Sequence, residues 1–368
     1  MKSIFIIAPI QKAYSETFIQ NHIDYLPGQK TAIYSLGCDA HFEDGTTLLK
    51  SDILSRAFRF CERKVTGVKL IDQEIRRLVK FIKKEKSSCV LVEYGLTGAI
   101  LTSACKRNNI PFVVHFHGYD AYRKDIVLTY QSRYKRMFDE AKAIIAVSTD
   151  MKEKLMTLGA REENIECIPY GIDLDKFKQK QEDQVPSYVL ATGRFVEKKA
   201  PYLTILAFSK VLKDIHDAKL IMIGDGPLLG VCKQLVKSLG IEHALDFKGV
   251  VTHEEVAYLM RKAFCFVQHS LVPENGDSEG TPLAILEASA SGLPVISTRH
   301  AGIKDAVLHE ESGYLVEEGD IKGMAKHITN LFQNPELAYE LGKKGREWIS
   351  ANYNIHHRIN DLWQVLSS

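Results

Sequence analysis

Short apolar runs alternate with amphipathic helical patterns along the whole chain, which predicts an α/β protein with parallel sheets. In the first half, runs with the length of buried strands fall at residues 3–9, 31–35, 89–93, 112–116, 143–147 and 165–168. Longer helical stretches separate them, among them residues 73–86 and 98–108. The second half repeats the rhythm, with runs at residues 188–192, 218–223, 245–249, 265–268, 294–297 and 313–316. The pattern therefore indicates two domains of similar architecture.

A polar stretch between the halves marks the expected domain boundary. Residues 175–186 have no apolar period, contain Lys-Gln-Lys-Gln-Glu-Asp-Gln and end in a proline, so they are predicted to form an interdomain linker. The expected domains are residues 1–182 and residues 183–352. Two similar α/β halves around one linker imply a cleft, and such clefts are preferred ligand sites.

Two helical segments have a clear apolar face. The stripe on residues 201–213 has the spacing of a helix packed on a sheet and consists of Leu203, Leu206, Ala207 and Val211. The stripe on residues 353–368 consists of Ile355, Ile359, Leu362 and Leu366. This last helix is expected either to be a simple terminal helix or to pack back on the first domain.

Composition excludes several classes of protein. The 368 residues are 45% hydrophobic and 26% charged, proportions that exclude intrinsic disorder, collagen and coiled coil. The seven cysteines include no close C-x-x-C pair, which favours reduced thiols over a disulfide framework or a zinc site. No apolar run approaches the roughly 18 residues of a membrane span, and residues 3–9 are too short for a signal-peptide core. We therefore expect a soluble, cytoplasmic protein.

The net charge of +2 is unevenly spread. Residues 51–88 carry 11 basic and 5 acidic side chains, a local charge of +6. This segment is interpreted as a solvated helical face, or as a surface attracted to anionic lipid or to an anionic glycan acceptor. Nucleic acid is not an expected partner, because no basic-aromatic stripe accompanies the charge.

The densest chemical signal lies at residues 277–295. Thr281 is a good N-cap and Pro282 suits the first helical position, so the amides of Leu283 and Ala284 are expected at a positive helix end that suits a phosphate.

Two carboxylates flank this expected helix start. Glu279 precedes it and Glu287 lies about one turn beyond the cap, so both can face a ligand along the helix start and accept hydrogen bonds from sugar or ribose hydroxyls. Capping and surface acids are the alternative interpretation.

Two further motifs follow strands of the second half. Arg194 and Lys199, after Gly193, can bring two cations onto a diphosphate, although basic residues in such places are often only solvated. Gly224 and Gly226 permit close backbone approach to a ligand, or form no more than a tight turn.

In the first half, His115 and His117 alternate onto the same face of a strand. A metal is not expected there, because no further His/Asp set with ligand spacing supports the pair. His117 is instead predicted to be a hydrogen-bond partner at the cleft, with Gly118 clearing space. The D-x-D pattern of Asp173 and Asp175, which some glycosyltransferases use to hold a metal, is interpreted as a turn.

These motifs together resemble the family 4 retaining glycosyltransferases with the GT-B fold, and they occur in family order over nearly the whole chain. The matching motifs are E-x7-E at Glu279 and Glu287, G-R-x4-K at Gly193, Arg194 and Lys199 with Ala200 replacing the usual Gly, G-x-G-P at Gly224, Gly226 and Pro227, H-G-x-D at His117, Gly118 and Asp120, and the strand-to-linker segment at Pro169, Gly171, Asp173 and Phe177.

Three segments are especially similar to bacterial exopolysaccharide and colanic-acid-type glycosyltransferases: residues 274–280, residues 297–303, and residues 15–19 with Ser15, Glu16 and Thr17. Many family members have a Gly-rich loop at the last of these, and this chain does not.

The resemblance implies two Rossmann-like domains and retaining transfer of a hexosyl unit from a UDP- or GDP-type sugar to a saccharide or lipid-linked acceptor, in cell-surface polysaccharide biosynthesis. No metal and no other cofactor is expected. No general base is named, since the acceptor proton can pass to the leaving phosphate. Peripheral contact with the inner face of a membrane is left open.

The resemblance also implies residue roles. Arg194 and Lys199 would neutralise the leaving diphosphate, Glu279 would hold donor-sugar hydroxyls, and His117 would contact the donor sugar from the acceptor side. The remaining donor-binding positions would be Gly193, Gly224, Gly226, Pro227, Val250, Gly280, Thr281, Pro282, Leu283 and Glu287, the last on the ribose. The acceptor-side positions would be Ser15, Glu16, Thr17, Gly118 and Asp120.

Three other functions are less well supported by the motifs. A GT-B sugar-nucleotide epimerase would share the fold, but its acid-base carboxylates are not identifiable. A catalytically silent homologue that only binds nucleotide is disfavoured by the intact charged motifs. A nicotinamide oxidoreductase is weaker still, because no G-x-G-x-x-G follows a strand.

Overall fold

The computed structural model describes residues 3–11, 17–37, 39–49, 64, 69–179 and 188–368, and the structural statements below concern these residues. The chain divides into two compact units. Unit 1 consists of Met1–Ile168 and His356–Ser368, and unit 2 consists of Pro169–Ile355.

Unit 1 is built on a seven-stranded sheet with the order β3-β2-β1-β4-β5-β6-β7. Its strands are β1 (Ser3–Ala8), β2 (Gln29–Tyr34), β3 (His41–Phe42), β4 (Cys89–Glu93), β5 (Phe112–His115), β6 (Ala143–Ala146) and β7 (Ile165–Cys167). All neighbours pair in parallel except β2 and β3. The six strands predicted for this half are confirmed. The two-residue edge strand β3 was not predicted, because so short a strand has no apolar period.

The helices of unit 1 cover a strongly apolar sheet, whose central strands β1 and β4 are almost entirely buried. They are α1 (Thr17–Tyr25), α3 (Leu70–Lys84), α4 (Gly95–Arg107), α5 (Tyr119–Tyr122), α6 (Lys124–Glu140), α7 (Thr149–Thr157) and α15 (Ile355–Ser367). The C-terminal α15 packs back on unit 1, where Lys142 Nζ donates to the Leu366 carbonyl at 3.4 Å and Tyr25 contacts the His356 ring.

Unit 2 contains a fully parallel six-stranded sheet with the order β10-β9-β8-β11-β12-β13. The strands are β8 (Val189–Thr192), β9 (Leu220–Ile223), β10 (Leu245–Gly249), β11 (Cys265–Gln268), β12 (Val295–Thr298) and β13 (Gly313–Val316), and all six were predicted. The helices are α8 (Pro201–Val211), α9 (Leu229–Leu239), α10 (His253–Lys262), α11 (Leu283–Ala290), α12 (Ile303–Ala306), α13 (Ile321–Gln333) and α14 (Pro335–Asn352).

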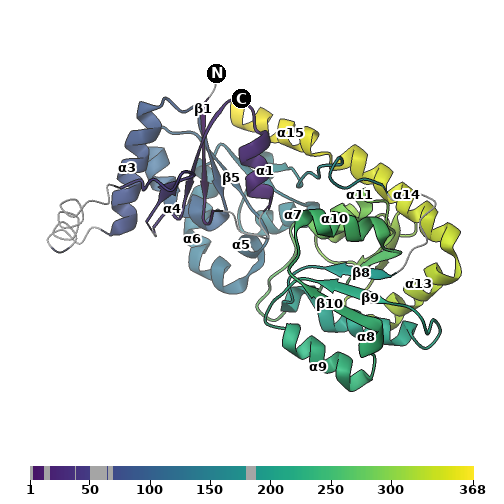
Figure 1. Ribbon diagram of the computed structural model, residues 1–368. Coiled ribbons are helices and arrows are strands. Elements are labelled where there is room, and N and C mark those ends of the chain that lie inside the picture. The colour runs from purple at the N-terminus through teal and green to yellow at the C-terminus, as the bar shows by residue number, and fades with distance from the viewer. Residues whose placement is uncertain (1–2, 12–16, 38, 50–63, 65–68, 180–187) are drawn as a thin grey trace. The chain divides into compact units, whose positions relative to one another are not determined.

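Two apolar clusters cover the two faces of the unit 2 sheet. One packs α8, α9 and α13 against the strands, and the other packs α10, α11 and α12 on the opposite face. Figure 1 shows α8 and α9 on one side of β8, β9 and β10, and α10 and α11 on the other. This doubly wound arrangement is the predicted Rossmann-like architecture.

The order of strands indicates where ligands bind in each unit. The chain first winds outward from β1 and then returns to β4 beside it, and β8 and β11 repeat that reversal in unit 2. In doubly wound sheets, ligands bind at the carboxyl ends of the strands at this reversal. Glu93 ends β4, and Gln268 ends β11. Gly193 follows β8 and begins the loop that carries Arg194 and Lys199, so this charged motif lies at the strand reversal of unit 2.

The boundary between the units differs from the predicted one. It lies at Ile168–Pro169, fourteen residues before the expected division after residue 182. The reason is that the segment after Pro169 packs on unit 2: the Ile172 amide donates to the Tyr353 carbonyl at 2.7 Å, and Phe177 is buried in that unit's core. Arg346 also donates to the Phe177 carbonyl at 2.8 Å. These contacts are long-range and leave no local signal in the polar stretch.

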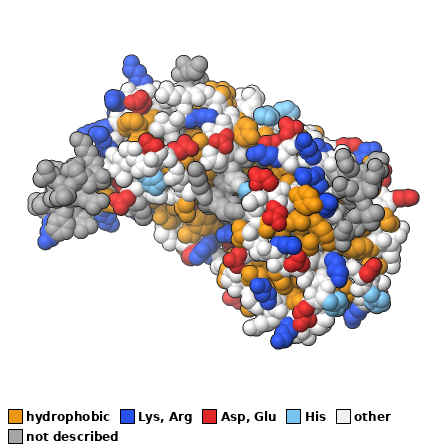
Figure 2. All heavy atoms as spheres, in the orientation of Figure 1, with side chains coloured by type: hydrophobic (Ala, Val, Ile, Leu, Met, Phe, Trp, Pro, Cys, Tyr) orange, Lys and Arg blue, Asp and Glu red, His pale blue; other side chains and the backbone are white. Residues whose placement is uncertain are grey.

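Part of the basic segment at residues 51–88 lies outside the described residues. Within the described part, Arg76, Arg77, Lys80, Lys83 and Lys84 are exposed along α3, as the solvated-face interpretation expects. On the face drawn in Figure 2, blue and red side chains are interspersed. Among the described helices, none has both the length and the apolar character to cross a membrane.

Candidate active site

Two loops at the carboxyl ends of β8 and β9 are packed directly against each other. The Gly193 amide donates to the Ile223 carbonyl at 3.0 Å, and the Phe195 amide donates to the Asp225 carbonyl at 2.9 Å. At Gly224, φ is +128° and a Cβ atom would lie 2.1 Å from the Gly193 carbonyl oxygen. Any larger residue would therefore separate the loops. Gly224 is needed for this packing, and it brings the G-x-G-P loop beside the arginine-lysine loop.

Lys199 and Glu279 form a buried ion pair, with Nζ and Oε1 3.1 Å apart. Lys199 also donates to Gln268 Oε1 at 3.1 Å. Burial alone would raise the pKa of the Glu279 carboxyl, but the charges of Lys199, Lys198 and His300 and the hydrogen bond from Lys199 together outweigh it and lower that pKa to about 2. Burial lowers the pKa of Lys199, and Glu279 opposes that shift. The structure thus brings together two predicted site residues that are 80 positions apart.

Arg194 lies beside this pair but behaves differently. Its side chain is exposed, and among the described residues it forms no ion pair. Arg194, Lys199, Gly193 and Gln268 line one cavity of about 30 Å³. Lys199, which a carboxylate holds, and Arg194, which pairs with no described residue, therefore line the same small cavity at the end of β8, and their charges favour an anionic group beside it.

The loop that carries Glu279 is anchored by residues that sequence reasoning did not single out. Lys198 Nζ contacts Asp277 Oδ1 and the Ser278 carbonyl, both at 3.1 Å. The Glu279 amide donates to His300 Nε2 at 3.3 Å. Because Nε2 accepts that bond, the proton of a neutral His300 is on Nδ1, which donates to Glu318 Oε1 at 2.6 Å. His300 appeared in the sequence only as part of a resembling segment, and Glu318 had no signal.

The start of α11 differs from the expected cap. Pro282, with φ −82° and ψ 84°, occupies the N-cap position, and the helix begins at Leu283. Thr281 is therefore not the N-cap; its Oγ1 accepts a long hydrogen bond of 3.5 Å from the Tyr170 amide instead. Proline suits N1 only when its ψ is helical, and here it is not, so the helix starts one residue later than the local sequence suggests.

Glu287 lies on the second turn of α11 and is partly buried. Its side chain has no hydrogen-bond partner among the described residues. Burial raises the pKa of the Glu287 carboxyl to about 8, and the charge of Lys199 opposes this shift. Glu279 and Glu287 thus face opposite electrostatic conditions although eight residues separate them. Of the other expected donor positions in unit 2, Gly280 is buried, whereas Pro227 and Val250 are exposed.

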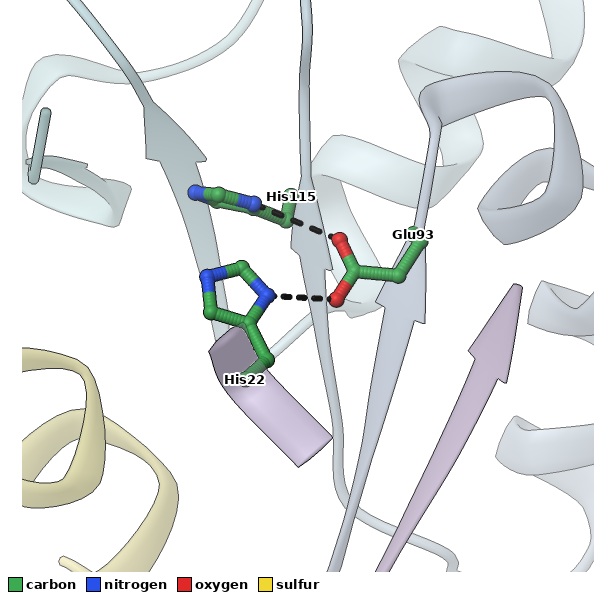
Figure 3. Close-up of side chains that lie close together, drawn as sticks. All are labelled: His22, Glu93 and His115. Carbon is green, nitrogen blue, oxygen red and sulfur yellow. Dashed lines mark hydrogen bonds and ion pairs between the residues drawn. The ribbon is translucent and has the colours of Figure 1, made fainter. Parts of the chain in front are cut away.

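In unit 1, three histidines converge on one carboxylate. Glu93 Oε1 lies 2.8 Å from His22 Nδ1, and Oε2 lies 2.7 Å from His117 Nε2 and 3.3 Å from His115 Nδ1. Figure 3 shows the His22 and His115 rings on one side of the Glu93 carboxylate. The His117 ring stacks on Phe18 with centroids 4.4 Å apart. Sequence reasoning named His115 and His117 but missed Glu93 and His22, which only the fold brings to them.

The electrostatics of this cluster follow from its burial. Burial would raise the pKa of Glu93, but the charge of His22 and the hydrogen bonds from the three histidines hold that pKa well below its usual range. Burial, aided by the charge of His117, lowers the pKa of His115 to about 3. His115 is therefore neutral and Glu93 ionised at neutral pH.

Asp120 holds the loop that follows β5. Its carboxylate accepts hydrogen bonds from the amides of His117 and Gly118 at 3.0 Å and of Gly95 at 2.8 Å. Gly118 has φ +128°, a conformation that favours glycine. Burial raises the pKa of Asp120, opposed by the charge of His117 and these amides. In unit 1, Asp120 and Gly118 thus shape the backbone around His117.

The remaining expectations concern the acceptor-side residues 15–17 and the D-x-D pattern. Ser15 and Glu16 lie outside the described residues, and Thr17 is the first residue of α1. Asp173 Oδ1 accepts from the amides of Asp175 and Lys176, so the D-x-D pattern is a turn, as predicted.

The chain is similar to known glycosyltransferases. The family described as "Glycosyl transferases group 1" matches residues 173–348, and "Glycosyltransferase Family 4" matches residues 16–176. The chain is 29% identical over 281 residues to the amylovoran biosynthesis glycosyltransferase AmsK of Erwinia amylovora, covering 75% of this chain and 69% of that protein. It is 27% identical over 258 residues to WcaL of Escherichia coli (strain K12), named for colanic acid biosynthesis, covering 68% and 63%.

The fold also matches a solved structure. HepE of Anabaena, solved in complex with UDP, aligns over 100% of both chains with a TM-score of 0.78 at 15% identity. Together, the matches favour neither an epimerase nor a silent nucleotide-binding homologue.

Proposed function

Because the chain belongs to the family 4 glycosyltransferases, we propose that it moves a hexosyl unit from a nucleotide diphosphate sugar to a saccharide or lipid-linked acceptor, with retention at the anomeric carbon. The observation that carries the proposal is that two cations, Arg194 and Lys199, lie together around one small cavity after β8. Two adjacent cations at a strand reversal suit a diphosphate. The match to an amylovoran glycosyltransferase supports a role in cell-surface polysaccharide biosynthesis.

Arg194 and Lys199 stabilise the leaving diphosphate. As the bond from the anomeric carbon to the phosphate oxygen breaks, negative charge develops on that oxygen, and preorganised cations lower the barrier. Glu279 holds Lys199 at 3.1 Å, so the ammonium group is positioned before the donor arrives. The helix start at Leu283, which has no side-chain cap, adds a positive end for the same phosphates.

The two glutamates divide the recognition of the donor. Glu279, beside Lys199, accepts hydrogen bonds from hydroxyl groups of the donor sugar close to the reacting carbon. The Glu287 side chain has no hydrogen-bond partner among the described residues. It accepts hydrogen bonds from the ribose hydroxyls of the donor. His117 contacts the donor sugar from the acceptor side, held by Glu93 and Phe18.

Transfer requires no Mg²⁺ or Mn²⁺ and no cofactor other than the donor. Lys199 and Arg194 take the place that a divalent ion would have at the diphosphate, and the D-x-D carboxylate of Asp173 is engaged in its own turn. The acceptor hydroxyl passes its proton to the departing phosphate oxygen on the same face of the sugar.

Thermal unfolding with UDP, GDP, ADP and their hexose conjugates tests the donor. A nucleotide that binds only the folded state raises the unfolding midpoint, and Arg194→Ala should reduce that rise. Nuclear magnetic resonance of the product with the identified donor then reports the anomeric configuration. The proposal fails if no nucleotide raises the midpoint, or if the product has the inverted configuration.

Peripheral membrane contact accompanies a lipid-linked acceptor. The support is the row of exposed basic side chains on α3, each worth up to about 1 kcal/mol near an anionic leaflet. Co-sedimentation with anionic vesicles should weaken with salt and with the pair Lys83→Gln and Lys84→Gln. Equal binding to neutral vesicles, or none to anionic ones, contradicts this contact.

A further inference from the structure

The cluster around Glu93 contains more than the proposed transfer reaction uses. His22, Glu93 and His115 have relative exposures of 7%, 0% and 2%. They come from α1, the end of β4 and the end of β5, and lie 71 and 22 positions apart along the chain. Each can offer one donor atom, and these three atoms all lie within 4.8 Å of one another. The sequence expectation of no metal at His115 depended on the lack of further ligands, and the fold supplies two.

We propose that His22 Nδ1, His115 Nδ1 and the Glu93 carboxylate form a buried site for one divalent transition-metal ion of the zinc class. Two imidazoles and one carboxylate are a donor set that zinc and its neighbours accept, and they are poor ligands for Mg²⁺, which prefers oxygen.

The distances fit such an ion. Ligand atoms about 2.1 Å from a tetrahedral ion are about 3.4 Å apart. Glu93 Oε2 and His115 Nδ1 are 3.3 Å apart, and Glu93 Oε1 and His22 Nδ1 are 2.8 Å apart. The two rings meet edge to face with centroids 5.0 Å apart, and Figure 3 shows a nitrogen of each ring directed at the carboxylate. An ion would replace the hydrogen-bonding protons between the rings and the carboxylate, and the three ligand atoms, which lie within 4.8 Å of one another, would draw together around it.

Charge supports the same conclusion. An ionised carboxylate without exposure requires compensation. Glu279 has Lys199 for this purpose, whereas every ion-pair partner of Glu93 among the described residues is a histidine. A divalent ion bound by both imidazoles and the carboxylate would supply this positive charge in place of a protonated histidine. His117, whose Nε2 is 2.7 Å from Glu93 Oε2, lies beside the three ligands and orients the carboxylate.

The ion is structural. It joins α1 to the ends of β4 and β5 and takes no part in the proposed transfer step. Its presence is therefore measured without an activity assay, and a negative result leaves the proposed function standing.

Elemental analysis of the full-length protein, purified without a polyhistidine tag and dialysed against metal-free buffer, tests the site. We expect about one equivalent of zinc or a related metal per chain, falling to background in Glu93→Gln and in His22→Gln. His216→Gln, an exposed histidine of unit 2, is the matched control and should keep the metal. Stripped wild-type protein should gain thermal stability with ZnCl₂, and should show the visible absorption of tetrahedral Co²⁺ with CoCl₂.

The wild-type measurements decide the question even if a variant fails to fold. Less than about a tenth of an equivalent, together with no thermal shift on adding zinc or cobalt, would overturn the proposal. Glu93 would then be held only by hydrogen bonds from the three imidazoles. Metal that persists in both Glu93→Gln and His22→Gln would contradict the assigned ligands.

Discussion

Glu93 of unit 1 and Glu279 of unit 2 are both buried, yet their surroundings compensate the charge in different ways. Glu279 faces the ammonium group of Lys199 and, with a smaller effect, that of Lys198. Glu93 faces three imidazoles, each of which is a cation or a neutral nitrogen donor depending on its surroundings.

The difference separates two kinds of site. A lysine held by a glutamate is a positioned positive charge, and an arriving diphosphate can share it. A set of imidazoles around a carboxylate is a ligand set, and a metal ion can join it. Units of the same doubly wound architecture thus carry different chemistry beyond the carboxyl ends of their strands, because different side chains lie there.

The largest expected effect comes from removing the cation of unit 2. Lys199→Ala should lower transfer roughly 10²-fold or more, because one preorganised stabilising group is lost. It should also lower the free energy of unfolding by about 3 kcal/mol, since it leaves Glu279 buried without its closest cation. Steady-state kinetics and denaturant unfolding measure the two effects.

A double variant separates those effects. Lys199→Met combined with Glu279→Gln removes both charges, so stability should recover while transfer stays low. If transfer recovers together with stability, Lys199 acts only through the fold and the diphosphate site is wrong.

Arg194→Ala sharpens the comparison, since Arg194 is exposed and pairs with no described residue. Transfer should again fall roughly 10²-fold, while the free energy of unfolding should stay within about 0.5 kcal/mol of the wild type. Wild-type turnover in Arg194→Ala would remove this residue from the proposed diphosphate site.

The glutamates and His117 should separate sugar handling from nucleotide binding. Glu279→Gln and His117→Ala should each lower turnover by about tenfold or more and leave nucleotide affinity nearly unchanged, because they act on the donor sugar. Glu287→Ala should weaken nucleotide binding itself, since a ribose contact contributes equally in ground and transition states. Calorimetric titration with the nucleoside diphosphate, beside kinetics, distinguishes the roles, and the opposite pattern reverses them.

The pH dependence of stability should have opposite signs for Glu279 and Glu287. The pKa of Glu279 falls from 4.5 to about 2, so its stabilisation is complete above about pH 4.5 and is lost as the pH falls towards 2. The pKa of Glu287 rises from 4.5 to about 8, so its stabilisation is complete below about pH 4.5 and is lost as the pH rises to 8.

Unfolding curves against pH test both signs. Glu279→Gln should converge with the wild type in stability at low pH, whereas Glu287→Gln should gain on the wild type between pH 4.5 and 8. Parallel curves for either variant would contradict the burial-driven shift at that residue.

Divalent metal ions are expected to have no effect on the rate of transfer. Transfer should be equal with and without added Mg²⁺ or Mn²⁺, and Asp173→Asn should not change it, because Asp173 accepts hydrogen bonds within its own turn. A rate that requires Mg²⁺ or Mn²⁺ and is lost in Asp173→Asn would overturn the metal-independent mechanism.

The sequence by itself determined the elements and the chemistry of the motifs. Buried parallel strands are continuous apolar runs, so their type and place are visible locally, as β4, β11 and β13 show with their predicted bounds. The arginine-lysine loop follows β8 as expected, because a strand end and a glycine are local signals too. The helix of residues 353–368 was recognised from its period, but not the unit that it joins.

Only the tertiary structure decided which side chains meet. The boundary at Ile168 depends on the contacts of Ile172 and Phe177 with unit 2, and the start of α11 depends on the backbone angles of Pro282. Glu93 looks in the sequence like the last residue of an ordinary strand. The parallel pairing of β4 with β5 places it opposite His115, and the packing of α1 adds His22. Contacts between distant segments depend on pairing and packing over the whole sheet, and no local pattern of residues encodes them.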